Sequence, residues 1–539
     1  MNNAKLPTFP RPEEIPAECV LGAPIEQREV LTDGEIHTWG GDAQEVRSPV
    51  MVAREAGLER VRLGSFPLLG EAEALATLDA AVRAWDSGRG GWPTMPIGAR
   101  IEHVEEFTHR MVAQRAAVVK LLMWEIAKTR ADSEREFDRT VEYIRGTVDA
   151  LKDLDRASSR FTIEQGILAQ IRRAPLGVVL CMGPYNYPLN ETFTTLIPAL
   201  IMGNTVVFKP PRLGALLHRP LLEAFRDAFP RGVVNTVYGS GRTTMTPIMA
   251  SGKVDALAFI GTSGPADALK KAHPHPHRLR CVLGLEAKNP AIVLPDADLE
   301  LAVAECALGA LSFNGQRCTA IKVIFVHRSI ADEFLGRLAA AVNGLKAGMP
   351  WEDGVALTPL PEEGKTEHLS GLVQDAVERG ASVVNPGGAA VAGTYFAPAV
   401  VFPVDARMRA WHEEQFGPVI PVAPFDDPAT AVEYVIASNY GQQISIFGSD
   451  PQRIAELIDP LVNQVCRVNI NSQCQRGPDS FPFTGRKDSA EGTLSVSDAL
   501  RVFTIRTLVA AKIGAANKAI VTDILRNRRS SFLSTDFIL

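Results

Sequence analysis

The 539-residue sequence lacks any run of about 18 apolar residues, which is the length that a membrane-spanning helix requires. Its polar start, MNNAKLPTFPRPEE, lacks the apolar segment of a secretory signal. The charge balance, 56 basic against 62 acidic side chains for a net charge of -6, gives no broad cationic field for nucleic acid. These absences predict a protein with neither a membrane nor a nucleic-acid partner.

Cysteine is also scarce, with seven residues scattered along the chain and no CxxC pair. A disulfide framework is therefore not expected, and a reducing cytoplasm is the predicted location. The remaining composition, 46% hydrophobic and 22% charged residues, is that of an ordinary globular protein. A chain of this length is expected to form two or more domains, and no internal repeat divides it.

From about residue 175, short apolar runs alternate with helical segments, which is typical of a mostly parallel sheet. PLGVVLCMG, TVVFKP and ALAFIG are predicted strands, and ETFTTLIPALIMGN and HRPLLEAFRDAF are predicted helices. A second alternating series follows RCVLGLEAKNP and extends toward residue 472. Two doubly wound α/β domains are therefore predicted, and the alternation in FTIEQGILAQIRR adds a hairpin arm near residues 155–174.

One cysteine stands in a loop that could carry chemistry. FNGQRCT places Cys318 in a glycine-containing loop between a predicted helix and a predicted strand. An exposed thiol beside Arg317 would favour the nucleophilic thiolate. A cysteine is also often a small buried hydrophobe, and on spacing alone the two interpretations fit equally well.

Five motifs in order, GPYNYP, VVFKPPR, LGLEAKNP, FNGQRCT and EEQFGPV, resemble the aldehyde dehydrogenase superfamily over about residues 90–512. GQRCTAIK and QRGPDSFPF are most similar to its non-phosphorylating, NADP-dependent glyceraldehyde-3-phosphate dehydrogenases. The resemblance implies a homodimer or homotetramer with separate cofactor-binding, catalytic and oligomerisation parts. We assign these to residues 1–154 and 175–288, to 289–489, and to 155–174 and 490–512, with a C-terminal extension at 513–539.

The resemblance also implies the catalytic roles. Cys318 would attack the aldehyde carbon, and the side-chain amide of Asn186 with the Cys318 N–H would bind the resulting oxyanion. Without the other motifs, Asn186 beside prolines would be read as a turn residue. Activated water would then release the thioester.

The expected cofactor is NADP, with NAD possible. Lys209 matches the lysine that binds the adenosine ribose, and Arg212 stands where NAD-preferring members often carry a glutamate. A solvated surface role for Arg212 is the alternative. The other expected cofactor residues are Gly239, Gly241, Gly261, Thr262, Glu414 and Phe416.

The resemblance breaks at the general base. The family glutamate of ELGGK is replaced by Gly284 in LGLEAK, and Glu286 follows two residues later. In an extended strand these positions face the same side, so Glu286 is a candidate base or a structural carboxylate. The break leaves acyl transfer to coenzyme A as an alternative reaction. A non-catalytic dinucleotide-binding or structural protein is the alternative of another class.

Arginines suggest an anionic substrate. Arg317 and Arg476 match positions that hold the substrate phosphate in the glyceraldehyde-3-phosphate group, and Tyr187 and Thr319 complete the expected substrate site. An upstream arginine expected near residues 150–156 has no clear counterpart. A semialdehyde carboxylate is the alternative anion, and surface salt bridges are the alternative for either arginine.

Two segments carry other expectations. HPHPH, residues 273–277, resembles a metal tract, but the prolines hold the backbone extended, so we predict a surface loop and no metal site. In the C-terminal extension, ANKAIVTDILRN is a predicted helix. The apolar FLSTDFIL is expected to dock on a neighbouring subunit.

Overall fold

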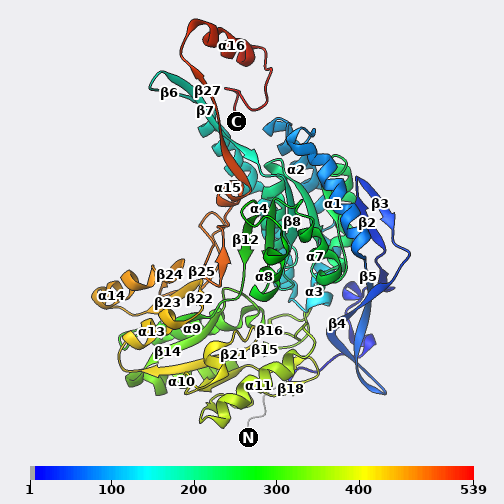
Figure 1. Cartoon of the computed structure of the whole chain (residues 1–539). Coiled ribbons are helices and arrows are strands. Elements are labelled where there is room, and N and C mark those ends of the chain that lie inside the picture. The colour runs from blue at the N-terminus through cyan, green and yellow to red at the C-terminus, as the bar shows by residue number, and fades with distance from the viewer. Residues whose placement is uncertain (1–5, 539) are drawn as a thin grey trace.

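The computed structural model describes residues 6–538 and divides the chain into two α/β domains with an arm that projects from them (Figure 1). The first domain is built on a six-stranded sheet in the order β10-β9-β8-β11-β12-β26, in which the short β26 alone runs antiparallel. Its strands are β8 (Val178–Met182), β9 (Thr205–Lys209), β10 (Val234–Thr236), β11 (Ala256–Ile260), β12 (Arg280–Gly284) and β26 (Ala490–Glu491).

The chain order in this sheet reverses between β8 and β11, which are parallel neighbours. At such a switch point the loops that follow the two strands separate and leave a crevice where ligands bind. Helices pack around the sheet, and four of them follow its strands. These are α5 (Asn190–Ile201), α6 (Leu222–Ala228), α7 (Gly241–Ala250) and α8 (Ser263–Ala272).

The first 160 residues contain both helices and strands. The helices are α1 (Glu71–Trp85), α2 (Ile97–Val112), α3 (Arg115–Ile126) and α4 (Arg130–Ser158). The unpredicted strands are β1 (Ile25–Glu26), β2 (Glu29–Thr32), β3 (Glu35–Thr38), β4 (Ala43–Arg54) and β5 (Gly57–Pro67). The β4–β5 hairpin runs beside the first domain and has irregular register near Arg47 (Figure 1).

The second domain contains a seven-stranded sheet in the order β17-β20-β21-β14-β13-β23-β24, in which only the edge strand β17 is antiparallel. Its strands are β13 (Asn289–Val293), β14 (Ile321–His327), β17 (Ser382–Val383), β20 (Ala399–Phe402), β21 (Val419–Phe425), β23 (Gln443–Phe447) and β24 (Arg467–Ile470). Its helices are α9 (Leu299–Leu311), α10 (Ala331–Asn343), α11 (Lys365–Glu378), α12 (Arg409–His412), α13 (Ala429–Ala437) and α14 (Pro451–Leu461). The predicted fold class, two doubly wound α/β domains with a β arm, is confirmed.

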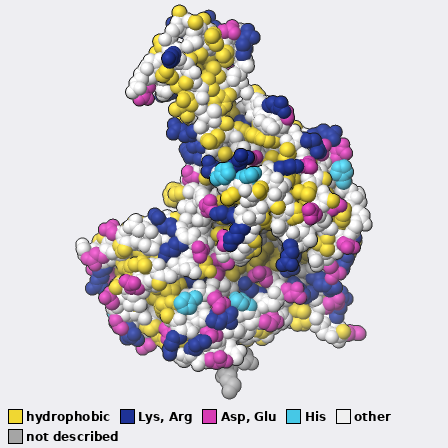
Figure 2. All heavy atoms as spheres, viewed as in Figure 1, with side chains coloured by type: hydrophobic (Ala, Val, Ile, Leu, Met, Phe, Trp, Pro, Cys, Tyr) yellow, Lys and Arg dark blue, Asp and Glu magenta, His cyan; other side chains and the backbone are white. Residues whose placement is uncertain are grey.

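The arm is a three-stranded antiparallel sheet of β6 (Phe161–Glu164), β7 (Ile167–Pro175) and β27 (Thr504–Lys512), which follows α15 (Asp498–Val502). It carries α16 (Ala515–Arg526) at its tip, in the place of the helix expected at 516–527. Figure 2 shows hydrophobic side chains gathered over the arm and α16. Those exposed by half or more include Ile163, Ile505, Leu508, Ile513 and Ile520.

The C-terminal tail packs on the arm of its own chain, and its docking on a neighbouring subunit stays a prediction. Gln170 donates to the Ser534 carbonyl at 2.5 Å, and Arg172 donates to the Phe532 carbonyl at 3.2 Å. Leu533 is buried. Strand β7 of the arm provides the hydrogen-bond donors that hold this segment. The last residue of FLSTDFIL lies outside the described residues.

Candidate active site

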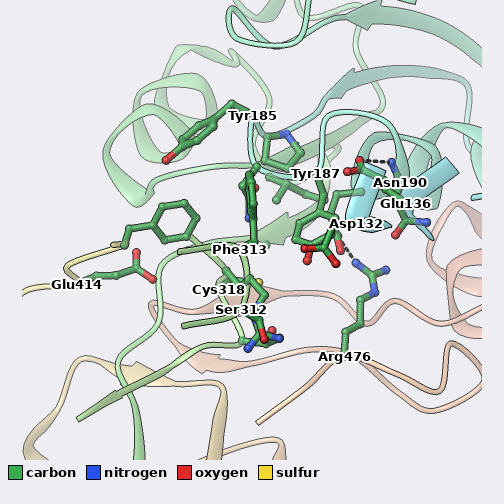
Figure 3. A pocket seen from close by; sticks show the side chains of 18 of the residues that line it. Asp132, Glu136, Tyr185, Tyr187, Asn190, Ser312, Phe313, Cys318, Glu414 and Arg476 are labelled. Atoms are coloured by element: carbon green, nitrogen blue, oxygen red, sulfur yellow. Dashed lines mark hydrogen bonds and ion pairs between the residues drawn. The ribbon is translucent and has the colours of Figure 1, made fainter. Parts of the chain in front are cut away.

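A cavity of about 1330 Å³ lies between the two sheets and is lined by residues of both domains. From the first domain it receives the ends of β8, β9 and β11, which are the strands around the switch point. From the second domain it receives the loop between α9 and β14, with Cys318, and the loop before β21, with Glu414. Figure 3 shows Cys318 between Glu414 on one side and Arg476 on the other.

The loop that carries Cys318 has a strained backbone. The backbone φ angles of Phe313, Asn314 and Gly315 are 49°, 55° and 71°. They lie in the left-handed region that residues other than glycine rarely adopt. Asn314 exchanges two hydrogen bonds with Thr358, at 3.0 and 2.9 Å. A Cβ atom at Gly315 would lie 2.6 Å from the Ala310 carbonyl oxygen, so the turn requires glycine there. This tight turn fixes where the thiol points.

Cys318 is half-buried, and its carbonyl accepts hydrogen bonds from Asn289 at 2.7 Å and from Lys322 at 3.2 Å. Among the described residues its backbone N–H meets no acceptor, which leaves it available to an oxyanion. Burial raises the pKa of the Cys318 thiol, and the Glu191 charge raises it further, whereas Lys322 and Arg476 oppose the shift. The resting thiol is therefore largely protonated at neutral pH.

Asn186 follows β8 in the predicted oxyanion position and is buried. Its side-chain amide donates to the Gln316 carbonyl at 2.8 Å, two residues before Cys318, which ties the two halves of the site together. An Asn amide carries two N–H donors, so the second stays available for an oxyanion. Behind it, the buried Lys128 donates to the Asn186 carbonyl at 2.7 Å and pairs with Glu136.

Glu136 and Lys128 brace the turn that contains Asn186. The Glu136 carboxylate accepts from the N–H groups of Leu189 and Asn190, both at 3.1 Å, at the start of α5. The Lys128 ammonium lies 3.6 Å from the ring centroid of Tyr187. Both side chains are fully buried, and a buried ion pair of this kind is tolerated only when its remaining hydrogen-bonding groups are satisfied.

Glu414 lies on the other side of Cys318 from Arg476 (Figure 3), and Phe416 lines the same cavity. Glu414 pairs with the buried Lys322 and accepts from the Ala287 N–H at 3.1 Å. Phe416 has a φ of 43°, and its ring packs edge-on against Tyr185 at 5.9 Å between centroids. Both predicted residues therefore line the cavity and are held by specific contacts.

The predicted adenosine-side residues lie at the carboxyl end of β9. Lys209 and the exposed Arg212 both line the cavity, and Lys209 makes no side-chain hydrogen bond to any described residue. Burial lowers the pKa of Lys209 to about 8, and the neighbouring Arg212 adds to this shift. Two cationic groups without a partner carboxylate suit a phosphorylated ribose, so the residues present fit an NADP-type cofactor.

The four predicted glycine-loop residues divide into two pairs. Gly261 and Thr262 line the cavity where β11 leads into α8. Gly239 and Gly241 lie at the start of α7 and are not part of the cavity wall. Gly239 has a φ of 117°, and a Cβ atom there would lie 3.0 Å from the Leu69 carbonyl oxygen, so packing within the chain accounts for this glycine.

Glu286, the candidate base, lines the cavity but is engaged at the start of a helix. Its carboxylate accepts from the Ser263 N–H at 2.8 Å, the first residue of α8. An unsatisfied N–H at a helix start attracts a carboxylate, so this contact supports the structural interpretation of Glu286. Gly284 also lines the cavity and leaves open the space that the family glutamate would occupy.

Arg476 and Arg317 lie in the same cavity wall, as predicted for an anion site. Arg476 is buried and pairs with Glu191, as the dashed line in Figure 3 marks. Among residues 6–538, neither Nη2 of Arg476 nor the buried Nε of Arg317 has a hydrogen-bond partner. Nη2 of Arg317 donates to the Gly309 carbonyl at 2.8 Å. Unpaired N–H groups of this kind are costly until an anion accepts from them. Tyr187 and Thr319 also line the cavity.

The upstream arginine that was expected near residues 150–156 does not lie in that segment of the cavity wall. Arg156 is exposed, pairs with Asp153 and lies away from the cavity. Arg139, on α4, lines the cavity instead and forms two hydrogen bonds with Asp479, at 2.8 and 2.7 Å.

No group of three potential metal ligands occurs among residues 6–538. The histidines of HPHPH lie in a turn, where His275 and His277 are exposed but His273 is buried and bonds the Val254 carbonyl at 3.0 Å. Only part of the segment is therefore the predicted surface loop. None of the described helices is both long and apolar enough to cross a membrane.

A thiol beside the ligand-binding switch point of a doubly wound sheet defines a class of oxidoreductase that combines covalent thiol chemistry with a nicotinamide dinucleotide. The aldehyde dehydrogenase family profile matches residues 54–509. The chain belongs to the aldehyde dehydrogenase family and is an NAD(P)-dependent aldehyde oxidoreductase.

Similar proteins agree with this assignment. The NADP-dependent glyceraldehyde-3-phosphate dehydrogenase of Streptococcus equinus is 33% identical over 82% of this chain and 91% of its own. That of Pisum sativum is 31% identical over 78% and 85%. The Bacillus halodurans C-125 enzyme of the same name, solved with NADP, is 32% identical with a TM-score of 0.82 and covers 91% of this chain and 100% of its own. Escherichia coli lactaldehyde dehydrogenase is 25% identical, with a TM-score of 0.83 and the same coverage.

Proposed function

We propose that the enzyme oxidises glyceraldehyde 3-phosphate irreversibly to 3-phosphoglycerate with NADP. The observation that carries the substrate proposal is the convergence of Arg139, Arg317 and Arg476 on the cavity of Cys318, with unpaired N–H groups on the last two. Guanidinium groups bind phosphate through paired hydrogen bonds. The relatives from Streptococcus equinus and Pisum sativum, named for this substrate and cofactor, support the same proposal.

Lys209 and Arg212 hold the adenosine side of the cofactor, and Glu414 and Phe416 flank its nicotinamide side. The arginine that replaces a glutamate at position 212 pairs with a 2′-phosphate instead of repelling it. When bound, NADP accepts the hydride that the oxidised carbon loses.

Cys318 attacks the aldehyde carbon after its proton leaves for solvent. The oxyanion of the thiohemiacetal is held by the Cys318 N–H and the free N–H of the Asn186 amide. Oxidation leaves a thioester on Cys318, and an attacking water releases the acid and the thiolate.

The second reaction to consider is acyl transfer to coenzyme A. Gly284 and the engagement of Glu286 by Ser263 favour it, because a thiol nucleophile requires less help from a base than water does. The family assignment argues against the third alternative, a non-catalytic dinucleotide-binding protein. We also infer a cytoplasmic homo-oligomer, supported by seven free cysteines and by the apolar arm.

Following NADPH formation separates these readings. Steady turnover of glyceraldehyde 3-phosphate without coenzyme A supports the proposal, turnover only with coenzyme A supports acyl transfer, and no oxidation of any aldehyde supports the non-catalytic reading. Arg139→Ala and Arg317→Ala test the anion site. Each should raise KM for glyceraldehyde 3-phosphate about 10-fold or more and leave KM for uncharged glyceraldehyde within about twofold. Equal effects on both aldehydes would contradict a phosphate site.

A further inference from the structure

Hydrolysis of a thioester needs a base that this chain lacks at the family position, where Gly284 stands. The cavity wall contains several carboxylates, and three of them, Glu136, Glu362 and Glu414, are each engaged by at least two partners. Glu414 binds Lys322 and the Ala287 N–H, and Glu362 binds Tyr185 and Lys365. Carboxylates engaged in this way are poorly placed to take a proton from water.

Glu191 differs from these groups. It is the second residue of α5, five positions after Asn186, and it lines the cavity with 8% of its surface exposed. Among the described residues, Glu191 Oε2 receives one hydrogen bond, from Arg476 Nη1, and Oε1 receives none from a side chain or backbone group. The ion pair with Arg476 uses Oε2, and Oε1 remains available to a water molecule.

Glu191 also lines the same cavity as the reacting sulfur. Of the charged groups around Cys318, Glu191 raises the pKa of the thiol most, ahead of Glu414. Glu286 is absent from the charges that most affect this pKa, so it acts on the thiol less than Glu191 does. The other titratable groups that act on Glu191 are Arg476, Arg139, Lys128 and the Tyr143 hydroxyl.

The geometry points to Glu191 as the catalytic base of deacylation, a role that rests on the proposed hydrolytic function. Glu191 Oε1 takes one proton from water as the water oxygen bonds to the acyl carbon. The carbon–sulfur bond then breaks, and Cys318 leaves as the thiolate. The product acid loses its proton to solvent, and Glu191 releases its own before the next turnover.

The test uses Glu191→Gln, because the amide oxygen still accepts from Arg476 and keeps the wall intact. Stopped-flow mixing with NADP and glyceraldehyde 3-phosphate should give a burst of about one NADPH per subunit at a rate within about threefold of wild type. The steady-state rate should fall by about 10² to 10⁴. Intact mass spectrometry should show acyl-enzyme accumulating, and hydroxylamine, which attacks thioesters without base help, should restore turnover.

Glu191→Asp should retain at least a tenth of the wild-type steady-state rate, because it keeps a carboxylate on the same helix. Glu142→Gln, an exposed position on α4, controls for the loss of one charge and should match wild type. A steady-state rate of Glu191→Gln within threefold of wild type would overturn the inference. Loss of the NADPH burst in Glu191→Gln would also overturn the inference. The same holds if hydroxylamine does not accelerate the slow steady-state phase of this variant. The proposed function fails separately, if the wild-type enzyme gives no burst with any aldehyde.

Discussion

The guanidinium of Arg476 donates to the carboxylate of Glu191 within the wall of the cavity that holds Cys318. This ion pair joins two requirements of the reaction, since Arg476 faces the expected anion and Glu191 faces the expected water. Binding and hydrolysis are thereby supported by one pair of side chains.

The first prediction concerns the ionisation of Cys318. Burial and Glu191 raise its pKa, so the alkylation rate of the cofactor-free enzyme by iodoacetamide should rise with pH through an inflection above the ordinary thiol value of about 8.5. Glu191→Gln removes a neighbouring negative charge and should move this inflection to lower pH. An unchanged inflection would show that Glu191 does not act on the thiol.

The second prediction concerns Lys209. Its pKa of about 8 means that the ammonium is charged at pH 7 and largely neutral at pH 9.5. The affinity for NADP, measured by isothermal titration calorimetry, should therefore fall about 10-fold over this interval, and Lys209→Met should bind weakly at both pH values. A wild-type affinity that does not change with pH would exclude a charged contact at Lys209.

The same shift has a consequence for stability. Between pH 8 and about 10.4, the unfolded chain carries a proton on Lys209 that the folded chain has released. The contribution of this group to the free energy of unfolding should therefore increase as pH rises through that window. Denaturation of wild type and Lys209→Met at pH 7.5 and 9.5 isolates the contribution.

The third prediction concerns Gly284, which stands where the family base is expected. A Cβ atom there would lie 3.5 Å from Ile260 side-chain atoms, an ordinary contact, so a glutamate can be introduced. In the Glu191→Gln background, Gly284→Glu should raise the steady-state rate at least 10-fold without changing the NADPH burst. Gly284→Gln is the matched control and should give no recovery.

The fourth prediction concerns the pair behind Asn186. Lys128→Met leaves Glu136 buried without its cation and should lower the free energy of unfolding by about 3–5 kcal/mol. Urea denaturation measures this loss. The double variant Lys128→Met with Glu136→Gln should recover part of the lost free energy of unfolding. Arg145→Ala, at an exposed position on the same helix as Glu136, should have little effect. A mild effect of Lys128→Met would mean that the pair does not support the Asn186 turn.

The sequence was sufficient to predict both α/β domains, because buried parallel strands have short apolar sequences that lie between amphipathic helices. Only the five family motifs in their order allowed four residues to be assigned to one site, namely Cys318, Asn186, Lys209 and Glu414. Arg139 could not be assigned in this way, since its position on α4 depends on how that helix packs against a loop more than 300 residues later. Hydrophobic alternation in the long β4–β5 hairpin is weak, so its strands were missed.

Other differences come from contacts that a linear pattern does not encode. The apolar tail predicted to bind a neighbour finds donors in Gln170 and Arg172 of its own arm. The two-position spacing of Gly284 and Glu286 suggested a shared face, yet α8 supplies an N–H that engages the Glu286 carboxylate. In both cases a polar partner far away in the chain determines the arrangement.

The most direct test of the account is the site of covalent attachment. Wild-type enzyme mixed with NADP and glyceraldehyde 3-phosphate, quenched after the first turnover and mapped by peptide mass spectrometry, should carry the acyl group on Cys318. Cys318→Ser should show neither the adduct nor the NADPH burst. An adduct on another residue, or undiminished oxidation by Cys318→Ser, would contradict the account.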